Sequence, residues 1–242
     1  MEFYTDEEAD LSKHGYAVIP NVLAPHEVDD VARRVDSVLA DKASRKLLEF
    51  EWCWRLALKL GRDSRLHPLL PPEMHPAQCT LFAKTAKNNW LVSLHQDLSV
   101  PVAGRVDSPS CTGWCEKEGS MFVQPPAYIL EGLVAVRLHI DECTEQNGAL
   151  RVVPGSHRLG RLSPDAALHE RRANGERAVS VAKGGVMVMR PLLLHASSKS
   201  EIPRPRRVLH FVFGPKVLSE GLRWATRRDR NPRGQGGPSS SP

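Results

Sequence analysis

Residues 133–141 read LVAVRLHID, and they show the clearest strand pattern in this chain of 242 residues. Successive side chains of a β-strand point to opposite faces, so alternate residues share a face. One face of this stretch is apolar, with Val134, Val136, Leu138 and Ile140. The other face holds Ala135, Arg137, His139 and Asp141. The stretch predicts a strand with one apolar face and one face that can carry polar groups.

Other segments with strand character lie on both sides of this stretch. Residues 15–20, 78–84 and 90–95 precede it, and residues 149–153, 184–190 and 206–213 follow it. Asn147-Gly148 is a strong hairpin-turn signal before the strand at 149–153. Residues 105–126 carry no regular pattern, and we expect a long loop that is either disordered or a substrate lid.

Helical patterns are concentrated near the start of the chain. Pro25 suits a first helical position, and the valines that follow it predict an amphipathic helix of about four turns. A second helix is expected over residues 45–60, and residues 163–177 tolerate a helix. Early helices followed by short, turn-separated strands predict an α+β fold with a double-stranded β-helix (jelly-roll) core and flanking N-terminal helices.

Composition and charge limit the possible classes of function. The net charge is +5, but residues 223–233 hold five arginines against one aspartate, so the rest of the chain is nearly neutral. We expect one domain over residues 1–228 and a basic disordered tail over 229–242, a division that disfavours a nucleic-acid-binding domain. No apolar run has the roughly 20 residues that cross a bilayer. The acidic start and the five unpatterned cysteines indicate a cytoplasmic protein with reduced thiols.

The sequence His95-Gln96-Asp97 places an imidazole and a carboxylate two residues apart. Ten histidines and 28 acidic residues give about one such pair by chance, and His139-Ile140-Asp141 is a second one. If His195 joins the first pair, two imidazoles and one carboxylate form one face of a coordination sphere and leave the opposite positions open. Such a site suits iron(II), with two open positions for a chelating oxo-acid and one for dioxygen.

A dicarboxylate co-substrate also needs a cation for its second carboxylate, because an unpaired buried charge costs several kcal/mol. Arginine suits this role because its planar guanidinium can form two parallel hydrogen bonds to a carboxylate. Arg206 lies 11 residues after His195, on the last strand pattern. Alternation alone leaves open whether Arg206 or Arg207 faces the interior, and Arg204 is a further candidate.

Several segments together resemble the phytanoyl-CoA dioxygenase family of iron(II)- and 2-oxoglutarate-dependent oxygenases. They are residues 15–23, His95-Gln96-Asp97, residues 147–150 with Pro154-Gly155-Ser156-His157, and His195 followed by Ser197 and Arg206. They occur in the family's order across about 200 residues.

The resemblance implies roles for individual residues. His95, Asp97 and His195 would be the iron ligands, and Arg206 would bind the far carboxylate of 2-oxoglutarate with help from the Ser197 hydroxyl. Thr80 and Arg137 lie on strands that resemble those lining the co-substrate. The resemblance places no iron pair at His139 and Asp141. It implies hydroxylation of a small molecule by dioxygen with release of succinate and carbon dioxide.

Two other functions are compatible with the sequence. One is a non-catalytic jelly-roll module that keeps its metal ligands for stability. The other is a nucleobase demethylase recruited by the basic tail, which would need a basic groove in a body that is nearly neutral. Related halogenases lack the carboxylate ligand, so the presence of Asp97 argues against halogenation. The sequence does not indicate the identity of the substrate or the oligomeric state.

Overall fold

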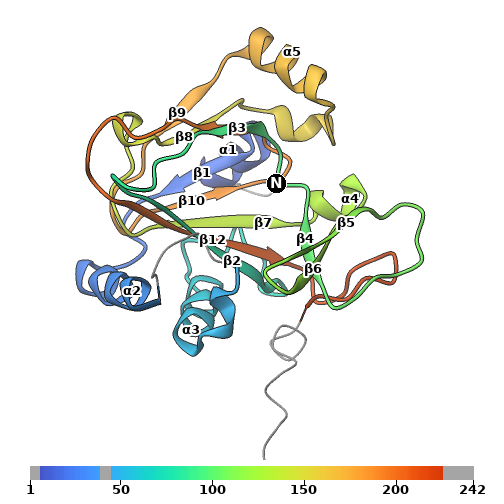
Figure 1. The fold of residues 1–242 in the computed structure, drawn as a ribbon, viewed down its shortest axis with the longest axis horizontal. Helices are drawn as coiled ribbons and strands as arrows, with labels where there is room; N and C mark the ends of the chain where they lie inside the picture. The colour runs from blue at the N-terminus through green and yellow to red at the C-terminus, as the bar shows by residue number, and fades with distance from the viewer. Residues whose placement is uncertain (1–5, 39–44, 226–242) are drawn as a thin grey trace, which may run out of the picture.

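The computed structural model describes residues 6–38 and 45–225, so the expected tail lies outside the described residues. Two antiparallel sheets face each other (Figure 1). The larger sheet has the strand order β1-β10-β7-β12-β2 and the smaller one the order β3-β11-β8-β9. Strands of the larger sheet are β1 (Tyr16–Ile19), β2 (His75–Lys84), β7 (Val134–His139), β10 (Val186–Met189) and β12 (Arg206–Gly214). Strands of the smaller sheet are β3 (Val92–His95), β8 (Leu150–Val152), β9 (Arg177–Val179) and β11 (His195–Ser197). The predicted jelly-roll core is confirmed.

Helices flank both sheets. Helix α1 (Asp6–His14) leads into β1, while α2 (Pro25–Val38) and α3 (Glu51–Leu60) lie on the side of the larger sheet that faces away from the smaller one (Figure 1). Helix α5 (Pro164–Asn174) lies beyond the smaller sheet, and its first turn is capped by Ser163, whose hydroxyl accepts a hydrogen bond from the Ala166 amide at 3.2 Å. The flanking N-terminal helices are therefore also confirmed.

The second predicted helix, over residues 45–60, is interrupted. A 3-10 turn, η1 (Leu47–Glu49), comes first, and Phe50 then takes an extended backbone with φ −78° and ψ 129° before α3 begins. Apolar side chains on both sides of this break still pack into one cluster with α2 and the larger sheet. The helical spacing in the sequence was real, but one extended residue divides the segment in two.

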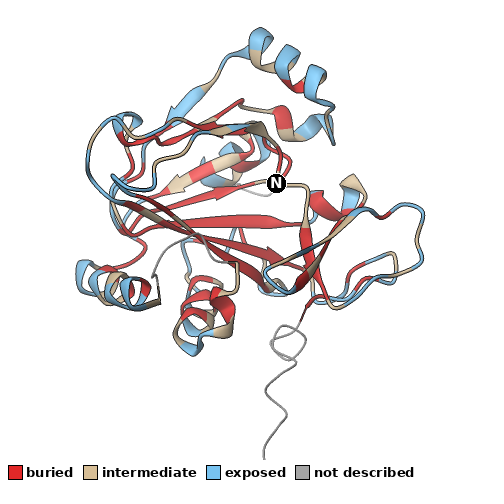
Figure 2. Ribbon diagram, viewed as in Figure 1, coloured by how far each residue is buried: buried red, intermediate tan, exposed pale blue. Residues whose placement is uncertain are grey.

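The two faces of β7 and β12 separate the apolar core from the interior between the sheets. Val134, Val136 and Leu138 of β7 pack in the same cluster as Leu209, Phe211 and Phe213 of β12, on the helix side. Arg137 and His139 therefore face the smaller sheet, as do Arg206 and His210. All of β7 is buried (Figure 2), because helices cover one face and the smaller sheet covers the other. This arrangement resolves the orientation that alternation left open: Arg206 points inward.

Residues 105–126 were expected to lack regular structure, and this prediction is wrong. They include β5 (Thr112–Lys117) and β6 (Ser120–Gln124), which form a three-stranded sheet with β4 (Val100–Val102). Glu118 and Gly119 both have positive φ, 52° and 71°, and join β5 to β6 in a two-residue turn flanked by the pair Lys117 and Ser120. Such turns match the twist of the strands they join. A short helix, α4 (Ala127–Glu131), then leads into β7.

The predicted hairpin at Asn147-Gly148 is also wrong, although the turn itself is present. Strands β7 and β8 belong to different sheets and do not pair. A 3-10 turn, η2 (Glu145–Asn147), ends at Gly148, which has a φ of 78°. The turn carries the chain from the larger sheet to the smaller one. A further 3-10 turn, η3 (Ser156–Leu159), follows β8.

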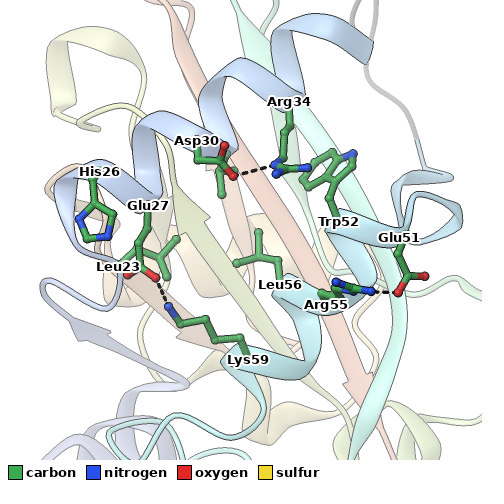
Figure 3. A pocket seen from close by; sticks show the side chains of 11 residues that line it. Leu23, His26, Glu27, Asp30, Arg34, Glu51, Trp52, Arg55, Leu56 and Lys59 are labelled. Atoms are coloured by element: carbon green, nitrogen blue, oxygen red, sulfur yellow. Dashed lines mark hydrogen bonds and ion pairs between the residues drawn. The ribbon is translucent and has the colours of Figure 1, made fainter.

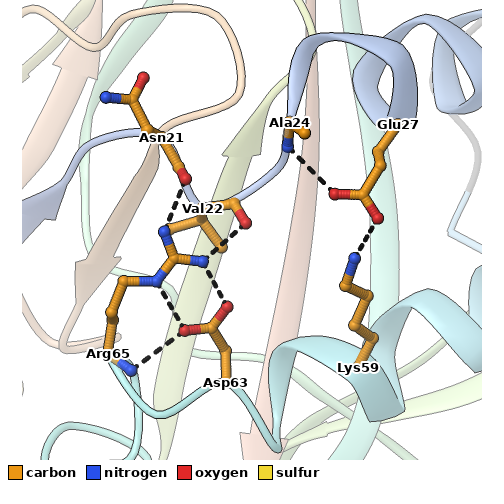
Figure 4. Close-up of polar contacts among 7 residues, drawn as sticks. All are labelled: Asn21, Val22, Ala24, Glu27, Lys59, Asp63 and Arg65. Atoms are coloured by element: carbon orange, nitrogen blue, oxygen red, sulfur yellow. Dashed lines mark hydrogen bonds and ion pairs between the residues drawn. The ribbon is translucent and has the colours of Figure 1, made fainter.

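Polar contacts join the turn after β1 and the start of α2 to α3 and the segment that follows it (Figure 4). Arg65, in the segment after α3, donates hydrogen bonds to the carbonyls of Asn21 at 2.6 Å and Val22 at 2.8 Å, in the turn after β1. Asp63 holds the same guanidinium through its carboxylate. These bonds join the turn between β1 and α2 to the segment that follows α3.

Candidate metal centre and carboxylate-binding site

His95, Asp97 and His195 meet between the two sheets. His95 ends β3 and His195 begins β11, and the two residues are direct partners across the β3–β11 pairing. Nε2 of His95 lies 3.7 Å from Oδ1 of Asp97, and Nε2 of His195 lies 3.8 Å from Oδ2. One ligand atom from each of the three side chains lies within 4.8 Å of the others, so the three atoms can share one metal ion.

Backbone carbonyls set the orientation of both imidazoles. Nδ1 of His95 lies 2.8 Å from the Ser93 carbonyl, and Nδ1 of His195 lies 2.8 Å from the Leu193 carbonyl. A carbonyl can only accept a hydrogen bond, so each Nδ1 carries the proton and each Nε2 offers a lone pair. Two imidazole nitrogens and a carboxylate oxygen match the donor set of non-haem iron(II) sites with open positions.

Gln96 holds the segment between the first two candidate ligands. Its side-chain amide donates to the carbonyls of Gly160 at 2.8 Å and Leu192 at 2.7 Å, and its Oε1 accepts from the Leu162 amide at 2.9 Å. The Asp97 amide donates to the Pro191 carbonyl at 2.9 Å. Gln96 therefore connects the ends of β3 and η3 to the segment before β11.

Burial and charge favour the protonation states that metal binding needs. Burial lowers the pKa of His195 to about 4, although the neighbouring Asp97 carboxylate opposes this effect. Burial acts to raise the pKa of Asp97, but the neighbouring histidines His195, His210 and His95, together with the charge of Arg137, hold the pKa below its usual value. At neutral pH, His195 is therefore neutral and Asp97 is ionised.

Three cations lie on the inward row of the larger sheet. Arg206 of β12 is 2% exposed and donates a hydrogen bond to the Gly148 carbonyl. Its register partner on β2, Lys84, is fully buried and donates to the Ser197 hydroxyl at 2.6 Å and to the Ser198 carbonyl. Burial and the nearby Arg206 lower the pKa of Lys84 to about 8. Arg137 of β7 is the third cation.

Arg137 and His210 lie close to the candidate metal ligands. Nη1 of Arg137 is 2.9 Å from Nδ1 of His210, and Nε2 of His210 is 3.7 Å from Oδ2 of Asp97. The guanidinium of Arg137 also lies over the ring of Phe82, with 5.5 Å between its central carbon and the ring centroid. Burial, followed by the charge of Arg206, lowers the pKa of Arg137 to about 10, so the side chain stays charged at neutral pH.

A small, partly open cavity of about 60 Å³ lies among the candidate ligands, Arg137 and Arg206. It is lined by Phe82, Trp90, Val92, His95, Asp97, Arg137, Leu150, His195, Ser197, Arg206 and His210. Six of the seven residues that the sequence suggested for the site are among them. Thr80 is buried outside this lining, where its hydroxyl accepts a hydrogen bond from Gln78 at 2.8 Å.

Sequence reasoning missed Lys84 and His210 as members of the site. The sequence could have indicated both residues. Lys84 lies four residues after Thr80, and His210 lies four residues after Arg206, so strand alternation puts each on the same face as a residue already predicted for the site. His139 and Asp141, the second His-x-Asp pair, were not expected to bind the metal. His139 is buried on β7, but the Asp141 carboxylate is hydrogen-bonded to Arg207 and takes no part in the metal-ligand cluster found among the described residues.

A larger hollow of about 710 Å³ lies outside the barrel, between α2 and α3 (Figure 3). Its charged side chains already pair with one another: Asp30 binds Arg34, Glu51 binds Arg55 and Glu27 binds Lys59. It contains none of the candidate metal ligands. The smaller internal cavity is therefore the chemically relevant one.

A jelly roll that encloses a His-Asp-His site beside buried cations defines the class of non-haem oxygenases that use iron(II) and a 2-oxo acid. The family model described as phytanoyl-CoA dioxygenase matches residues 11–208, so the chain belongs to this family. Family membership confirms the relationship and the class that the sequence indicated. No curated protein gave a match.

Solved structures with the same fold include three proteins of low sequence identity. The alpha-ketoglutarate-dependent epimerase SnoN from nogalamycin biosynthesis is 15% identical, with a TM-score of 0.66 over 87% of this chain and 82% of its own. EctD from S. alaskensis, solved with 2-oxoglutarate and 5-hydroxyectoine, is 18% identical, with a TM-score of 0.65 over 88% of this chain and 79% of its own. HygX from Streptomyces hygroscopicus, solved with nickel and 2-oxoglutarate, is 19% identical, with a TM-score of 0.62 over 90% of this chain and 89% of its own.

Proposed function

We propose that this protein hydroxylates a small molecule, using dioxygen and 2-oxoglutarate and releasing succinate and carbon dioxide. The observation that carries the proposal is the cluster of His95, Asp97 and His195, whose ligand atoms lie within 4.8 Å of one another beside buried cations in one cavity. The same arrangement accounts for both requirements of the class: a metal face with open positions and a counter-charge for a dicarboxylate.

Each part of the cavity has a proposed role. His95, Asp97 and His195 hold iron(II), which when bound supplies the activation of dioxygen that protein side chains cannot provide. Arg206 binds the far carboxylate of 2-oxoglutarate, and the Ser197 hydroxyl would turn from the Gly148 carbonyl, its acceptor in this structure, to donate to the same carboxylate. Lys84 already holds that hydroxyl and adds a positive charge.

The walls of the cavity support this proposal. Phe82, Trp90, Val92 and Leu150 line it between the polar groups. A bound co-substrate would displace water from between these apolar walls, and electrostatic attraction is stronger where water is excluded. The buried Nε of Arg206 has no hydrogen-bond partner among the described residues, so the guanidinium can accommodate another acceptor.

The partners and location of the protein remain predictions. The five cysteines are free, as expected of a cytoplasmic protein. No helix in the described ranges is long and apolar enough to cross a membrane. We propose a cytoplasmic enzyme that acts on a small molecule and does not bind nucleic acid.

The activity can be tested with purified protein supplied with iron(II), ascorbate and 2-oxoglutarate. We expect succinate release that requires iron(II), and we expect His95→Ala, Asp97→Ala and His195→Ala each to reduce it to the rate without protein. His157→Ala is a matched control, because this imidazole contacts the Ser12 carbonyl away from the cavity.

Two outcomes would contradict the proposal. Undiminished succinate release in the three ligand variants would show that these residues do not bind the catalytic metal. Iron-bound protein that neither binds 2-oxoglutarate nor shows a charge-transfer absorbance with it would favour the non-catalytic binding module.

A further inference from the structure

Arg137 is a buried cation to which the proposed function assigns no binding partner. It is 5% exposed, and among the described residues its guanidinium forms one side-chain hydrogen bond, between Nη1 and Nδ1 of the His210 ring. Its Nε is buried and has no hydrogen-bond partner in the described part of the chain. A buried guanidinium with unused donors is costly unless an anion binds to it.

The register of the larger sheet separates Arg137 from the other two cations. Arg206 pairs with Lys84 at the start of β12, whereas His210, four residues farther along, pairs with Arg137 of β7. Four residues of strand span roughly 13 Å at about 3.3 Å per residue. Arg206 lies at the Ser197 end of the cavity, and Arg137 lies with His210 at the Asp97 end.

Hydrogen-bond geometry directs Arg137 toward the metal ligands. His210 lies between the guanidinium and Asp97, with its Nδ1 toward Arg137 and its Nε2 toward the carboxylate. The Phe82 ring lies against the guanidinium. These two contacts limit the positions that the side chain can take, so His210 and Phe82 act as positioning residues for Arg137.

The charges of the cavity call for an anion at this end. Its lining includes Arg137 and Arg206 but a single carboxylate, Asp97, and iron(II) would add two positive charges. A 2-oxo acid that chelates a metal does so through its keto oxygen and the adjacent carboxylate, so that carboxylate must lie beside the metal. In 2-oxoglutarate the second carboxylate is at the other end of the molecule.

We infer that Arg137 binds the carboxylate adjacent to the keto group, the 1-carboxylate of 2-oxoglutarate, while Arg206 binds the distant one. This inference rests on the proposed function and adds to it a second carboxylate subsite. The guanidiniums of Arg137 and Arg206 would then bind the two carboxylates at opposite ends of the co-substrate. Arg137 would therefore contact the carboxylate that is lost as carbon dioxide when 2-oxoglutarate becomes succinate.

The test compares two ligands in two variants. 2-Oxoglutarate carries both carboxylates, whereas 2-oxopentanoate retains the 1-carboxylate and lacks the distant one. Dissociation constants are measured by calorimetry without oxygen, on full-length protein saturated with iron(II), so that the readout is binding and not turnover. The variants are Arg137→Gln and Arg206→Gln, and circular dichroism confirms that each remains folded.

A crossed pattern is expected. Arg137→Gln should weaken both ligands by the same factor, about ten- to a hundredfold, which is typical of a lost charge-assisted hydrogen bond. Arg206→Gln should weaken 2-oxoglutarate by a similar factor and leave 2-oxopentanoate unchanged. Arg190→Gln is the matched control, because this half-buried arginine does not line the cavity, and it should change neither constant.

The remaining outcomes overturn the inference in distinguishable ways. If Arg137→Gln weakens 2-oxoglutarate alone, Arg137 serves the distant carboxylate. If it changes neither constant but abolishes the stimulation of succinate release by a substrate, Arg137 reads an acidic group of that substrate. If the unaltered protein binds iron(II) but neither 2-oxo acid, the proposed function fails together with the inference.

If Arg137→Gln fails to fold, Arg137→Lys takes its place. Lysine keeps the positive charge but loses the planar pair of donors, so both ligands should again weaken by one common factor, smaller than that expected for glutamine. Affinities equal to those of the unaltered protein would overturn the inference, because a shared charge without directed hydrogen bonds would then suffice.

Discussion

At the scale of single residues, Gln96 shows how the site is held in shape. This side chain lies between two candidate metal ligands, yet its own three hydrogen bonds point away from the metal, to Gly160, Leu162 and Leu192. The central residue of the His-x-Asp motif therefore joins three chain segments. Its contribution to the metal site is positional.

Replacing Gln96 should weaken both the fold and the metal site. Gln96→Ala leaves two carbonyls and one amide without partners, and each buried unsatisfied group costs about 1–3 kcal/mol. We expect the free energy of unfolding to fall by several kcal/mol and iron(II) to bind more weakly, as measured by urea denaturation and by metal titration. Gln146→Ala, at an exposed glutamine, should leave both quantities unchanged. Equal stability of the two variants would show that Gln96 has no such role.

At the scale of elements, β2 and β12 form the wall that carries most of the charge. Their pairing places Lys84 beside Arg206, and Lys84 donates hydrogen bonds to Ser197 of the smaller sheet and to Ser198, the residue after β11. The Gly148 carbonyl, in the turn between the sheets, accepts from both Ser197 and Arg206. A side chain at Gly148 would collide with the Ser198 carbonyl, since an added Cβ would lie 2.5 Å from that oxygen.

Lys84 should make co-substrate binding depend on pH. Its pKa of about 8 means that the side chain is charged below pH 8 and loses its charge as the pH rises above this value. A carboxylate binds the charged form better, so the affinity for 2-oxoglutarate should fall between about pH 7.5 and 9. Calorimetry on iron(II)-loaded protein measures this fall, and Lys84→Met should bind more weakly at pH 7 and lose most of the dependence. An identical pH profile in the variant would exclude Lys84 as its source.

The elements also show what could be predicted from the sequence. Alternation in residues 133–141 and the spacing after Pro25 are set by local burial, so β7 and α2 were predicted correctly. The break at Phe50 and the change of sheet after Asn147 depend on packing against distant segments, which no local pattern encodes. Residues 112–124 form a hairpin through Glu118-Gly119, which is a weaker turn signal than Asn-Gly. His210 and Lys84 entered the site only when register placed them beside Arg137 and Arg206.

At the scale of the whole molecule, buried histidines connect stability to pH. Burial lowers the pKa of His195 to about 4 and the pKa values of His139 and His210 to about 3. In the unfolded chain these groups titrate near 6.5, so below this pH the unfolded state binds more protons than the folded state. Their stabilising contribution is complete above about pH 6.5 and is lost as the pH falls toward the folded-state values.

Metal-free protein should therefore lose stability steeply in mild acid. Three such groups give a slope of about 4 kcal/mol per pH unit between roughly pH 6 and 4, because each proton contributes about 1.4 kcal/mol per unit. Urea denaturation at several pH values measures the slope, and His139→Gln should reduce it by about one third. A free energy of unfolding that stays constant over this range would contradict the burial of these imidazoles.

The division of the barrel into two sheets has a consequence for how the chemistry of such a protein can change. The smaller sheet supplies both candidate histidine ligands, on β3 and β11, whereas Lys84, Arg137 and Arg206 all come from the larger sheet. Apart from Ser197, the residues proposed to bind the 2-oxo acid therefore lie on a different sheet from the two histidines proposed to bind the metal. Substitutions on the inward row of the larger sheet could exchange one organic acid for another while the iron chemistry is inherited intact.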